Sequence, residues 1–211
     1  MKPAGVLLAG GVASRMGGGD KSLKMLGGQP ILAHVIARIQ PQVVTLALNA
    51  NGDAARFARW SLPVVPDVIS GFPGPLAGIH AGMAWIQTSH PEIESIVSIP
   101  TDTPFLPADL IERLQAARDM AGADIAVASS GGQSHPVAAL WPVRLTAELY
   151  RLVTEDEMRR VTDFARCYSV VYADFPMSGI DPFFNINRPT DLERAELHII
   201  GSAVAQDAAI G

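Results

Sequence analysis

Two cations stand among a cluster of glycines near the N-terminus, in the segment Leu7–Leu23, LLAGGVASRMGGGDKSL. Arg15 and Lys21 are the side chains that could bind an anion, and Lys24 follows them. Glycine loses more conformational entropy on folding than any other residue, so such a cluster needs a reason. One reason is close approach of the backbone to a phosphate ligand whose charge the two cations neutralise. The alternative is a turn or linker that carries three solvated cations.

The spacing of these glycines excludes two common phosphate-binding motifs. A Walker A loop needs glycine directly before its lysine, but Asp20 precedes Lys21. The dinucleotide fingerprint G-x-G-x-x-G is absent, because Gly10 and Gly11 are adjacent and the next glycine is Gly17. The pattern therefore favours a longer loop that wraps phosphate groups.

The composition limits the class of protein. Of 211 residues, 48% are hydrophobic and 18% are charged, which indicates a globular domain with a sizeable core. The formal net charge of −5 gives no overall attraction to nucleic acid or anionic lipid. The apolar run at the N-terminus is too short for a signal peptide, and no segment is long enough to span a membrane. The one cysteine, Cys167, is expected to be buried and excludes an internal disulfide, so we expect a cytoplasmic protein.

Strand-like and helix-like segments alternate along the first part of the chain. Continuous apolar or β-branched runs predict strands, and apolar residues at helical spacing predict helices between them. The expected strands are Ala4–Ala9, Gln42–Asn49, Leu62–Asp67, Ser95–Pro100 and Asp124–Ser129, and the expected helices are Pro30–Gln40, Asp53–Trp60, Leu76–Ile86 and Pro107–Met120. This alternation predicts an α/β fold with a mostly parallel central sheet and helices on both faces.

The alternation changes after Ser130. A turn at Gly131–Gly132 is followed by further segments, expected as a strand at His135–Pro142, helices at Arg144–Val153 and Glu155–Arg166, a strand at Tyr168–Phe175, a loop at Phe183–Asn187 and a helix begun by Pro189. No internal repeat and no long linker marks a second domain, so we expect one domain.

Polar residues follow the carboxyl ends of several expected strands. In open α/β sheets, ligands bind beyond these ends, so Asn49, Asp67 and Asp102 should share one edge with Gly10 and Gly11. Each polar side chain could instead cap a helix or bond to its own turn. Their combination with a glycine-rich cationic loop favours a nucleotide site.

The motifs also resemble those of a known family. The opening loop, LAGGxxxRMGGxDKxL, is similar to the signature loop of the molybdenum cofactor guanylyltransferases, a branch of the nucleoside-diphosphate-sugar pyrophosphorylase-like nucleotidyltransferases. Further blocks stand in family order up to about Leu197: LNAN, PD, PGPLAG, PTDTPFLP, SHPVAAL and FFNINRP. Cytidylyltransferases that act on the same pterin typically have LAAG and lack the G-G-x-D-K continuation.

The resemblance implies a reaction and its participants. GMP passes from GTP to the terminal phosphate of molybdopterin, pyrophosphate is released, and Mg²⁺ is required. Molybdenum-insertion proteins and apo-molybdoenzymes are the implied protein partners, with no nucleic acid or membrane, and the protein is expected to be a monomer. Two alternatives stay open: a related cytidylyl- or sugar-phosphate nucleotidyltransferase, and a non-catalytic protein that binds a nucleotide or cofactor.

The same resemblance implies a fold and a division of the chain. The fold is a Rossmann-like three-layer sandwich of the nucleoside-diphosphate-sugar transferase type. One domain over residues 1–197 would contain a GTP-binding half, about 1–110, and a molybdopterin-facing half, about 111–197, followed by a tail at 198–211.

Carried over residue by residue, the resemblance implies a GTP site at the end of the first strand. Arg15 and Lys21 would neutralise the triphosphate, and Asp102 would contact both the nucleotide and Mg²⁺, which proteins usually hold through one or two carboxylates. These three would be the catalytic residues. The nucleotide-contacting positions are Leu8, Ala9, Gly10, Gly11, Lys21, Asn49, Asp67 and Asp102.

The implied pterin side lies later in the chain. Asn185 and Asn187 are two residues apart in an extended segment, so their side chains should share one face. Arg159 and Arg160 could meet the phosphate of molybdopterin or lie on a solvated helix face, and the sequence does not decide between these. His135 also matches the family but stays unassigned, since a histidine before a proline is often a turn residue.

Overall fold

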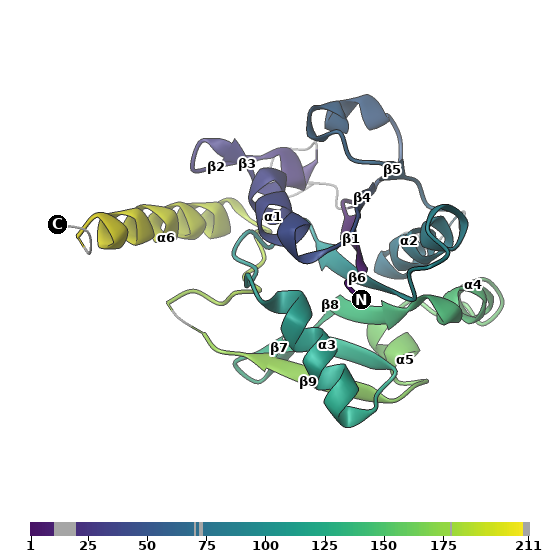
Figure 1. Cartoon of the computed structure of the whole chain (residues 1–211). Coiled ribbons are helices and arrows are strands. Elements are labelled where there is room, and N and C mark those ends of the chain that lie inside the picture. Colours follow the sequence, from purple (N-terminus) through teal and green to yellow (C-terminus); the bar gives the residue numbers. More distant parts are fainter. Residues whose placement is uncertain (11–19, 70, 72–73, 178, 209–211) are drawn as a thin grey trace.

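The computed structural model describes residues 1–10, 20–69, 71, 74–177 and 179–208, with residues 202–208 described by their backbone alone. Within these residues the chain forms a seven-stranded sheet in the order β5-β4-β1-β6-β8-β7-β9 (Figure 1). The strands are β1 (Ala4–Leu8), β4 (Leu46–Asn49), β5 (Val64–Val65), β6 (Ser95–Pro100), β7 (Ile125–Ser130), β8 (Gln133–Pro142) and β9 (Val170–Phe175).

The sheet is mostly parallel, as the sequence predicts. Only the two pairings of β8, with β6 and with β7, are antiparallel among the pairings of this sheet in the described residues. Gly131 and Gly132 join β7 to β8 with φ angles of 53° and 77°. Two successive positive φ angles match the right-handed twist of paired strands, which suits a tight hairpin that returns antiparallel.

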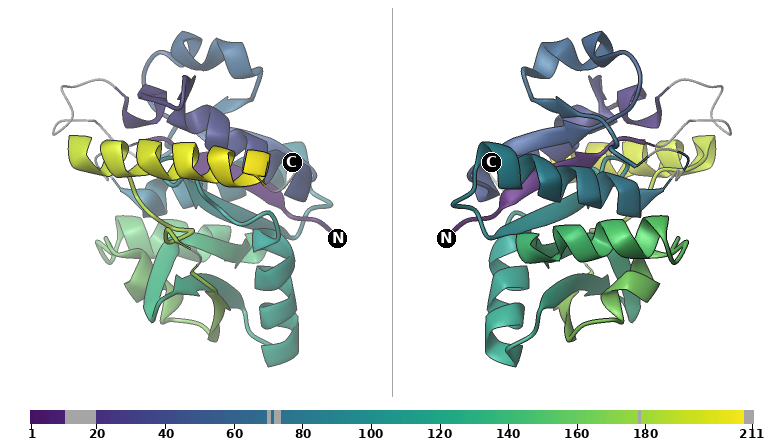
Figure 2. Two further views of the ribbon diagram at one scale, coloured as in Figure 1. Left: turned by 90° about the vertical axis from the view of Figure 1, so that its left-hand side faces the viewer. Right: turned by 90° about the vertical axis from the view of Figure 1, so that its right-hand side faces the viewer.

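Helices cover both faces of the sheet (Figures 1 and 2). On one face, α1 (Ile31–Ile39) and α3 (Leu110–Ala121) bury their apolar side chains against the sheet. On the other face, α2 (Pro75–Ser89), α4 (Thr146–Thr154) and α5 (Val161–Ala165) form a second apolar cluster. The predicted three-layer α/β sandwich is therefore confirmed.

Helix α2 packs very close to the sheet because of two glycines one turn apart. A Cβ atom at Gly82 would lie 2.6 Å from a methyl carbon of Val6 in β1. At Gly78 it would lie 2.3 Å from the amide oxygen of Asn49. Any side chain at either position would push α2 away from the sheet.

Several element boundaries differ from the sequence-based expectation. The helix expected at Glu155–Arg166 is wrong over its first part, because Glu157 has a φ of 52° and the helix begins only at Val161. Asp53–Trp60 is a 3₁₀ rather than an α-helix, η3 (Ala54–Trp60), with the Asp53 carboxylate accepting from Ala55 N–H. Other short segments are η1 (Lys21–Leu23), β2 (Met25–Leu26), β3 (Gln29–Pro30), η2 (Gln40–Gln42) and η4 (Val143–Leu145).

Helix α6 (Pro189–Ala208) extends well into the 198–211 segment that the sequence favours as a tail. It reaches away from the sheet (Figure 1) and packs on the β2–β3 hairpin, where Gly27 N–H donates to Glu196 Oε1 at 2.9 Å. Ile186, three residues before α6 begins, is buried in one apolar cluster with Leu26 of that hairpin. No helix in the described part of the chain is long and apolar enough to cross a membrane.

Candidate active site

Four parallel strands end side by side at one edge of the sheet. Leu8 at the end of β1 is level with Asn49 of β4 on one side and with Pro100 of β6 on the other. Asn49 is in turn level with Val65 of β5. A cavity of about 370 Å³ opens beyond these ends. Seven of the residues that the sequence predicts as ligand contacts line this cavity: Leu8, Gly10, Lys21, Asn49, Asp67, Asp102 and Asn185.

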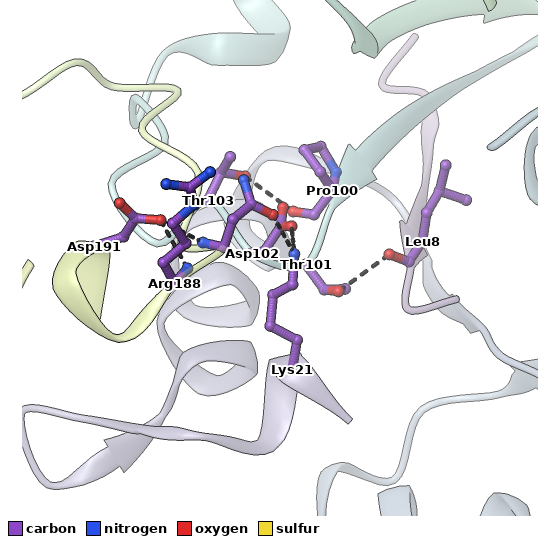
Figure 3. A network of polar contacts seen from close by, with 9 residues as sticks. Leu8, Lys21, Pro100, Thr101, Asp102, Thr103, Arg188 and Asp191 are labelled. Atoms are coloured by element: carbon purple, nitrogen blue, oxygen red, sulfur yellow. Dashed lines mark hydrogen bonds and ion pairs between the residues drawn. The ribbon is translucent and has the colours of Figure 1, made fainter. Parts of the chain in front are cut away.

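An ion pair joins the opening segment to the end of β6. Lys21 Nζ donates to Asp102 Oδ2 at 2.8 Å (Figure 3). It also donates to Asn187 Oδ1 at 2.5 Å. The Lys21 and Asp102 side chains are only 15% and 17% exposed. An ammonium group has three N–H donors, so Lys21 can make a further bond to an anion in the cavity.

Asp102 retains one oxygen that could bind a metal ion. Its Oδ1 atom is buried and has no hydrogen-bond partner among the described residues. A buried carboxylate oxygen without a donor is costly, which a cation would offset. No group of three or more His, Cys, Asp or Glu side chains in the described residues could hold a metal ion. A hard cation at Asp102 would thus need oxygens from a bound phosphate and water, the usual arrangement for Mg²⁺.

The segment that carries Asp102 is fixed by its neighbours (Figure 3). Thr101 Oγ1 donates to the carbonyl of Leu8 at 3.1 Å, and Thr103 Oγ1 donates to the carbonyl of Pro100 at 3.0 Å. The first bond joins the chain beyond β6 to the end of β1, and the second closes the turn that follows β6. The carboxylate is therefore held at a defined place on the cavity wall.

A second wall of the cavity is built from two asparagines and an aspartate. Asn49 Nδ2 donates to Asp67 Oδ1 at 2.9 Å and to the carbonyl of Val65 at 3.0 Å. Asn51 Nδ2 donates to Asp67 Oδ2 at 2.7 Å, and its Oδ1 accepts from Asp67 N–H at 2.8 Å. Both amide hydrogens of Asn49 are used, so this wall can offer a ligand the oxygens of Asp67, which accept, and the second amide hydrogen of Asn51, which donates. Asn51, which also lines the cavity, lies in the LNAN block but was not singled out from the sequence.

The N-terminus of α2 also lies at the cavity, since Gly74 and Pro75 line it. The first N–H groups of an α-helix have no partner within the helix, and the helix dipole is positive at this end. This end of the cavity therefore favours a negatively charged or hydrogen-bond-accepting ligand group.

Arg15 and Gly11 lie outside the described residues. Asp20, directly before η1, forms an ion pair with Arg56. The Nη2 group of Arg56 donates to the carbonyl of Asn51 at 2.7 Å. The chain entering η1 is thus attached to the same wall that holds Asp67. Ala9, also expected at the nucleotide, is buried directly after β1, and its N–H donates to the carbonyl of Asn49 at 2.9 Å.

Asn185 and Asn187 flank the buried Ile186 in an extended segment, so both asparagine side chains lie on its exposed face. Asn185 lines the cavity and Asn187 contacts Lys21. Ile186 N–H donates to the carbonyl of Asp102 at 2.9 Å, which attaches the segment to the β6 end. The Asp191 carboxylate accepts from Asn187 N–H at 2.8 Å and so connects the segment to the first turn of α6.

The residues left unassigned from the sequence have different environments. His135 is half-buried and its Nε2 lies 2.7 Å from Ser130 Oγ, and burial lowers the pKa of its imidazole. Arg159 and Arg160 are exposed just before α5, and neither lines this cavity. Cys167 is exposed, so the expectation that it is buried was wrong.

Sequence comparison identifies the family. Residues 5–169 match the model of the MobA-like NTP transferase domain. Over 191 residues the chain is 53% identical to a molybdenum cofactor guanylyltransferase from Rhodopseudomonas palustris (strain BisB5), covering 90% of this chain and 91% of that one. The chain belongs to the molybdenum cofactor guanylyltransferase family. The resemblance of its motifs is thereby confirmed over nearly the whole chain.

Two solved structures share the fold of this chain. Molybdopterin-guanine dinucleotide biosynthesis protein A from Archaeoglobus fulgidus superposes with a TM-score of 0.74 at 24% identity, covering 94% of this chain and 99% of that one. A Mycobacterium tuberculosis protein in complex with manganese gives a TM-score of 0.66 at 18% identity, covering 92% and 98%. At these identities the likeness supports the nucleotidyltransferase fold alone.

Proposed function

We propose that this protein transfers GMP from GTP to the terminal phosphate of molybdopterin, forming molybdopterin guanine dinucleotide and pyrophosphate. Besides membership in the family, the main support for this proposal is one contact. Lys21 Nζ and Asp102 Oδ2 lie 2.8 Å apart on the wall of the cavity at the strand ends. A cation and a carboxylate there are the two groups that a metal-bound triphosphate requires.

The reaction is a substitution at the α-phosphorus of GTP. An oxygen of the acceptor phosphate forms a bond to that phosphorus, and the bond to the β-phosphate oxygen breaks, so pyrophosphate leaves. Both reactants are anionic, so positioning and charge neutralisation supply most of the catalysis. Lys21 would turn from Asp102 and Asn187 towards the phosphates, with Arg15 as a second cation.

Asp102 is the residue that would hold Mg²⁺, through the oxygen that lacks a hydrogen-bond partner. When bound, Mg²⁺ would neutralise the growing charge on the leaving pyrophosphate. The hydrogen bonds that the Thr101 hydroxyl and the Ile186 N–H donate to carbonyl groups keep the segment that carries this carboxylate in place. This chemistry needs no covalent intermediate on the protein.

The wall formed by Asn49 and Asp67 suits a guanine base or the ribose hydroxyls. Guanine presents ring N–H and amino donors, and this wall offers acceptor oxygens. Asn51 would act by holding Asp67, because it bonds both to the carboxylate and to the backbone N–H of that residue. The backbone of Leu8, Ala9 and Gly10, with the turn at Gly11, would complete the nucleotide site.

The acceptor would lie on the side of Asn185 and Asn187. Residues of both proposed halves line the cavity. Lys21 and Asn49 belong to residues 1–110, and Val137 and Asn185 belong to residues 111–197. This supports a division in which GTP contacts the first half and molybdopterin the second. The product would then pass to molybdenum-insertion proteins or apo-molybdoenzymes.

The test is a purified, reconstituted reaction. The protein is incubated with molybdopterin, Mg²⁺ and each nucleoside triphosphate in turn, and pyrophosphate release and the dinucleotide product are measured. GTP should give molybdopterin guanine dinucleotide, and omission of either molybdopterin or Mg²⁺ should abolish pyrophosphate release. Turnover with CTP in place of GTP would favour a cytidylyltransferase, and GTP binding without turnover would favour a non-catalytic protein.

A further inference from the structure

A second polar cluster lies beside the cavity, between the β7–β8 hairpin and the segment that leads to Asn185. Ser130 ends β7, His135 lies in β8, and Asp181 precedes the segment. Ser130 Oγ is 2.7 Å from His135 Nε2 and 2.7 Å from Asp181 Oδ1. These three residues are not explained by the proposed chemistry at Lys21 and Asp102.

The direction of each hydrogen bond follows from counting protons. A serine hydroxyl has one hydrogen, and a carboxylate can only accept, so Ser130 donates to Asp181. Ser130 must therefore accept from His135, which carries its proton on Nε2. Burial lowers the pKa of the His135 imidazole, in agreement with a neutral ring. The chain of donors runs from His135 through Ser130 to Asp181.

This direction excludes a hydrolase-like triad. A catalytic serine gives its proton to the histidine, whereas Ser130 accepts from His135. Ser130 is also only 1% exposed, so no substrate can reach its hydroxyl. A structural purpose at the neighbouring site fits the geometry better.

The cluster holds the start of the segment that carries the two asparagines. Asp181 Oδ1 also accepts from Phe183 N–H at 2.8 Å. The His135 ring stacks on the Phe183 ring with centroids 4.4 Å apart and planes at 18°. Phe183 is 4% exposed, and Asn185, two residues later, lines the cavity.

We propose that Ser130, His135 and Asp181 are positioning residues that fix the register of Phe183–Asn187 and so place the amides of Asn185 and Asn187 for the acceptor phosphate or pterin. This inference rests on the proposed function for the identity of the acceptor. The segment is then anchored from two sides, by this cluster at Phe183 and by Asp102 at Ile186. Loss of the cluster should loosen the acceptor side more than the GTP side, because the cluster contacts the segment at Phe183, whereas Asp102 and Lys21 contact it further along, at Ile186 and Asn187.

The first test compares two neighbouring serines. Ser130→Ala removes the link between His135 and Asp181. Ser129→Ala is the matched control, because Ser129 Oγ lies 3.2 Å from a different carboxylate, Asp174, away from this segment. Ser130→Ala should raise the KM for molybdopterin about tenfold and the KM for GTP by much less, since a broken buried hydrogen bond misplaces the segment first at Phe183. Equal molybdopterin KM values for the two variants would overturn the proposal.

The second test separates positioning from charge. Ser130 and Phe183 both donate to the same oxygen of Asp181, Oδ1, and an asparagine offers the same acceptor there. Asp181→Ala should raise the molybdopterin KM as Ser130→Ala does, and Asp181→Asn should restore it. An Asp181→Asn variant as impaired as Asp181→Ala would show that the negative charge matters, and would refute a positioning role.

A third measurement does not depend on catalysis. Hydrogen exchange of the backbone amides at Phe183 and Ile186 should be faster in Ser130→Ala than in Ser129→Ala, with unchanged exchange in β1. Unchanged exchange at both amides would overturn the proposal even if the activity fell. If the wild-type protein transferred no GMP, the proposed function would fail, yet exchange would still report whether the cluster holds the segment.

Discussion

Lys21 Nζ and Asp102 Oδ2 form an ion pair of 2.8 Å between residues that are far apart in the sequence. The same ammonium group also donates to Asn187, so one side chain connects the opening segment, the end of β6 and the segment before α6. A bound triphosphate would compete with Asp102 and Asn187 for this ammonium group. The contact therefore has consequences for both metal binding and turnover.

Replacement of Lys21 should separate these two effects. Lys21→Met should lower kcat/KM for GTP by about 10²–10³-fold, because a desolvated phosphate charge loses its cation. Lys21→Arg need not restore activity, since the planar guanidinium has a different shape. Mn²⁺ binding without nucleotide, measured by electron paramagnetic resonance, should become stronger in Lys21→Met because Asp102 Oδ2 is released.

Lys24→Met serves as the control for this variant. Lys24 lies just beyond η1 and does not line the cavity. Its replacement should leave both GTP turnover and Mn²⁺ affinity at the wild-type level. A comparable loss of turnover in both variants would contradict a specific role for Lys21.

Asp102 should be indispensable for turnover but not for folding. Asp102→Asn keeps the size of the side chain and removes its charge, so Mg²⁺ affinity and GMP transfer should fall by at least about 10³-fold. Steady-state pyrophosphate release measures this loss, and circular dichroism checks that the variant is folded. The control is Asp109→Asn, at the start of α3, which should retain activity. Near-normal release from Asp102→Asn would argue against the metal-binding role.

The close contact between α2 and Asn49 predicts a strong effect at Gly78. A Cβ there would lie 2.3 Å from Asn49 Oδ1 and 2.9 Å from a methyl carbon of Leu8. Gly78→Ala should destabilise the fold by about 1–3 kcal/mol through overpacking and raise the KM for GTP. The free energy of unfolding from urea titration tests the first effect.

Gly201 is the matched glycine in another helix, where a Cβ would lie within 4 Å of no other described part of the chain apart from its own helical turn. Gly201→Ala should leave activity unchanged and stabilise α6 by up to about 1 kcal/mol, from helix propensity alone. If Gly78→Ala behaved like Gly201→Ala, the tight packing of α2 on the nucleotide wall would be refuted.

His80 should make the protein less stable in mild acid. The side chain is 5% exposed in α2, its Nδ1 has no hydrogen-bond partner among the described residues, and burial lowers its pKa from the ordinary 6.5. Below about pH 6.5 the unfolded chain therefore binds a proton that the folded chain does not, and stability falls as pH decreases. Above that pH both states are neutral at this residue.

Urea titrations at pH 8 and pH 5.5 measure this dependence. His80→Phe keeps a ring against Tyr150, whose ring centroid lies 5.5 Å from that of His80, and should show a smaller loss of stability on acidification. His90→Gln, at the end of the same helix, should keep the wild-type dependence. An identical pH dependence in the wild type and His80→Phe would exclude His80 as its source.

The sequence by itself determined the elements that depend on local pattern. Apolar runs and their spacing predict β1, β6, β7 and α2 nearly to their observed bounds, because strand and helix periods are properties of neighbouring residues. Local pattern was insufficient at residues 155–160, where Glu157 adopts a positive φ and interrupts the expected helix. The polar strand ends were also predictable, since parallel strands bring their carboxyl ends to one edge.

Only the tertiary structure decided which side chains meet. Asn51 holds Asp67, and Ser130 joins His135 to Asp181, although neither asparagine nor serine stands out by type or spacing. These contacts arise because separate strands and loops converge at one edge of the sheet, and a hydrogen bond forms only where donor and acceptor come within about 3 Å. Such a distance depends on the packing of the whole chain, which no local pattern specifies.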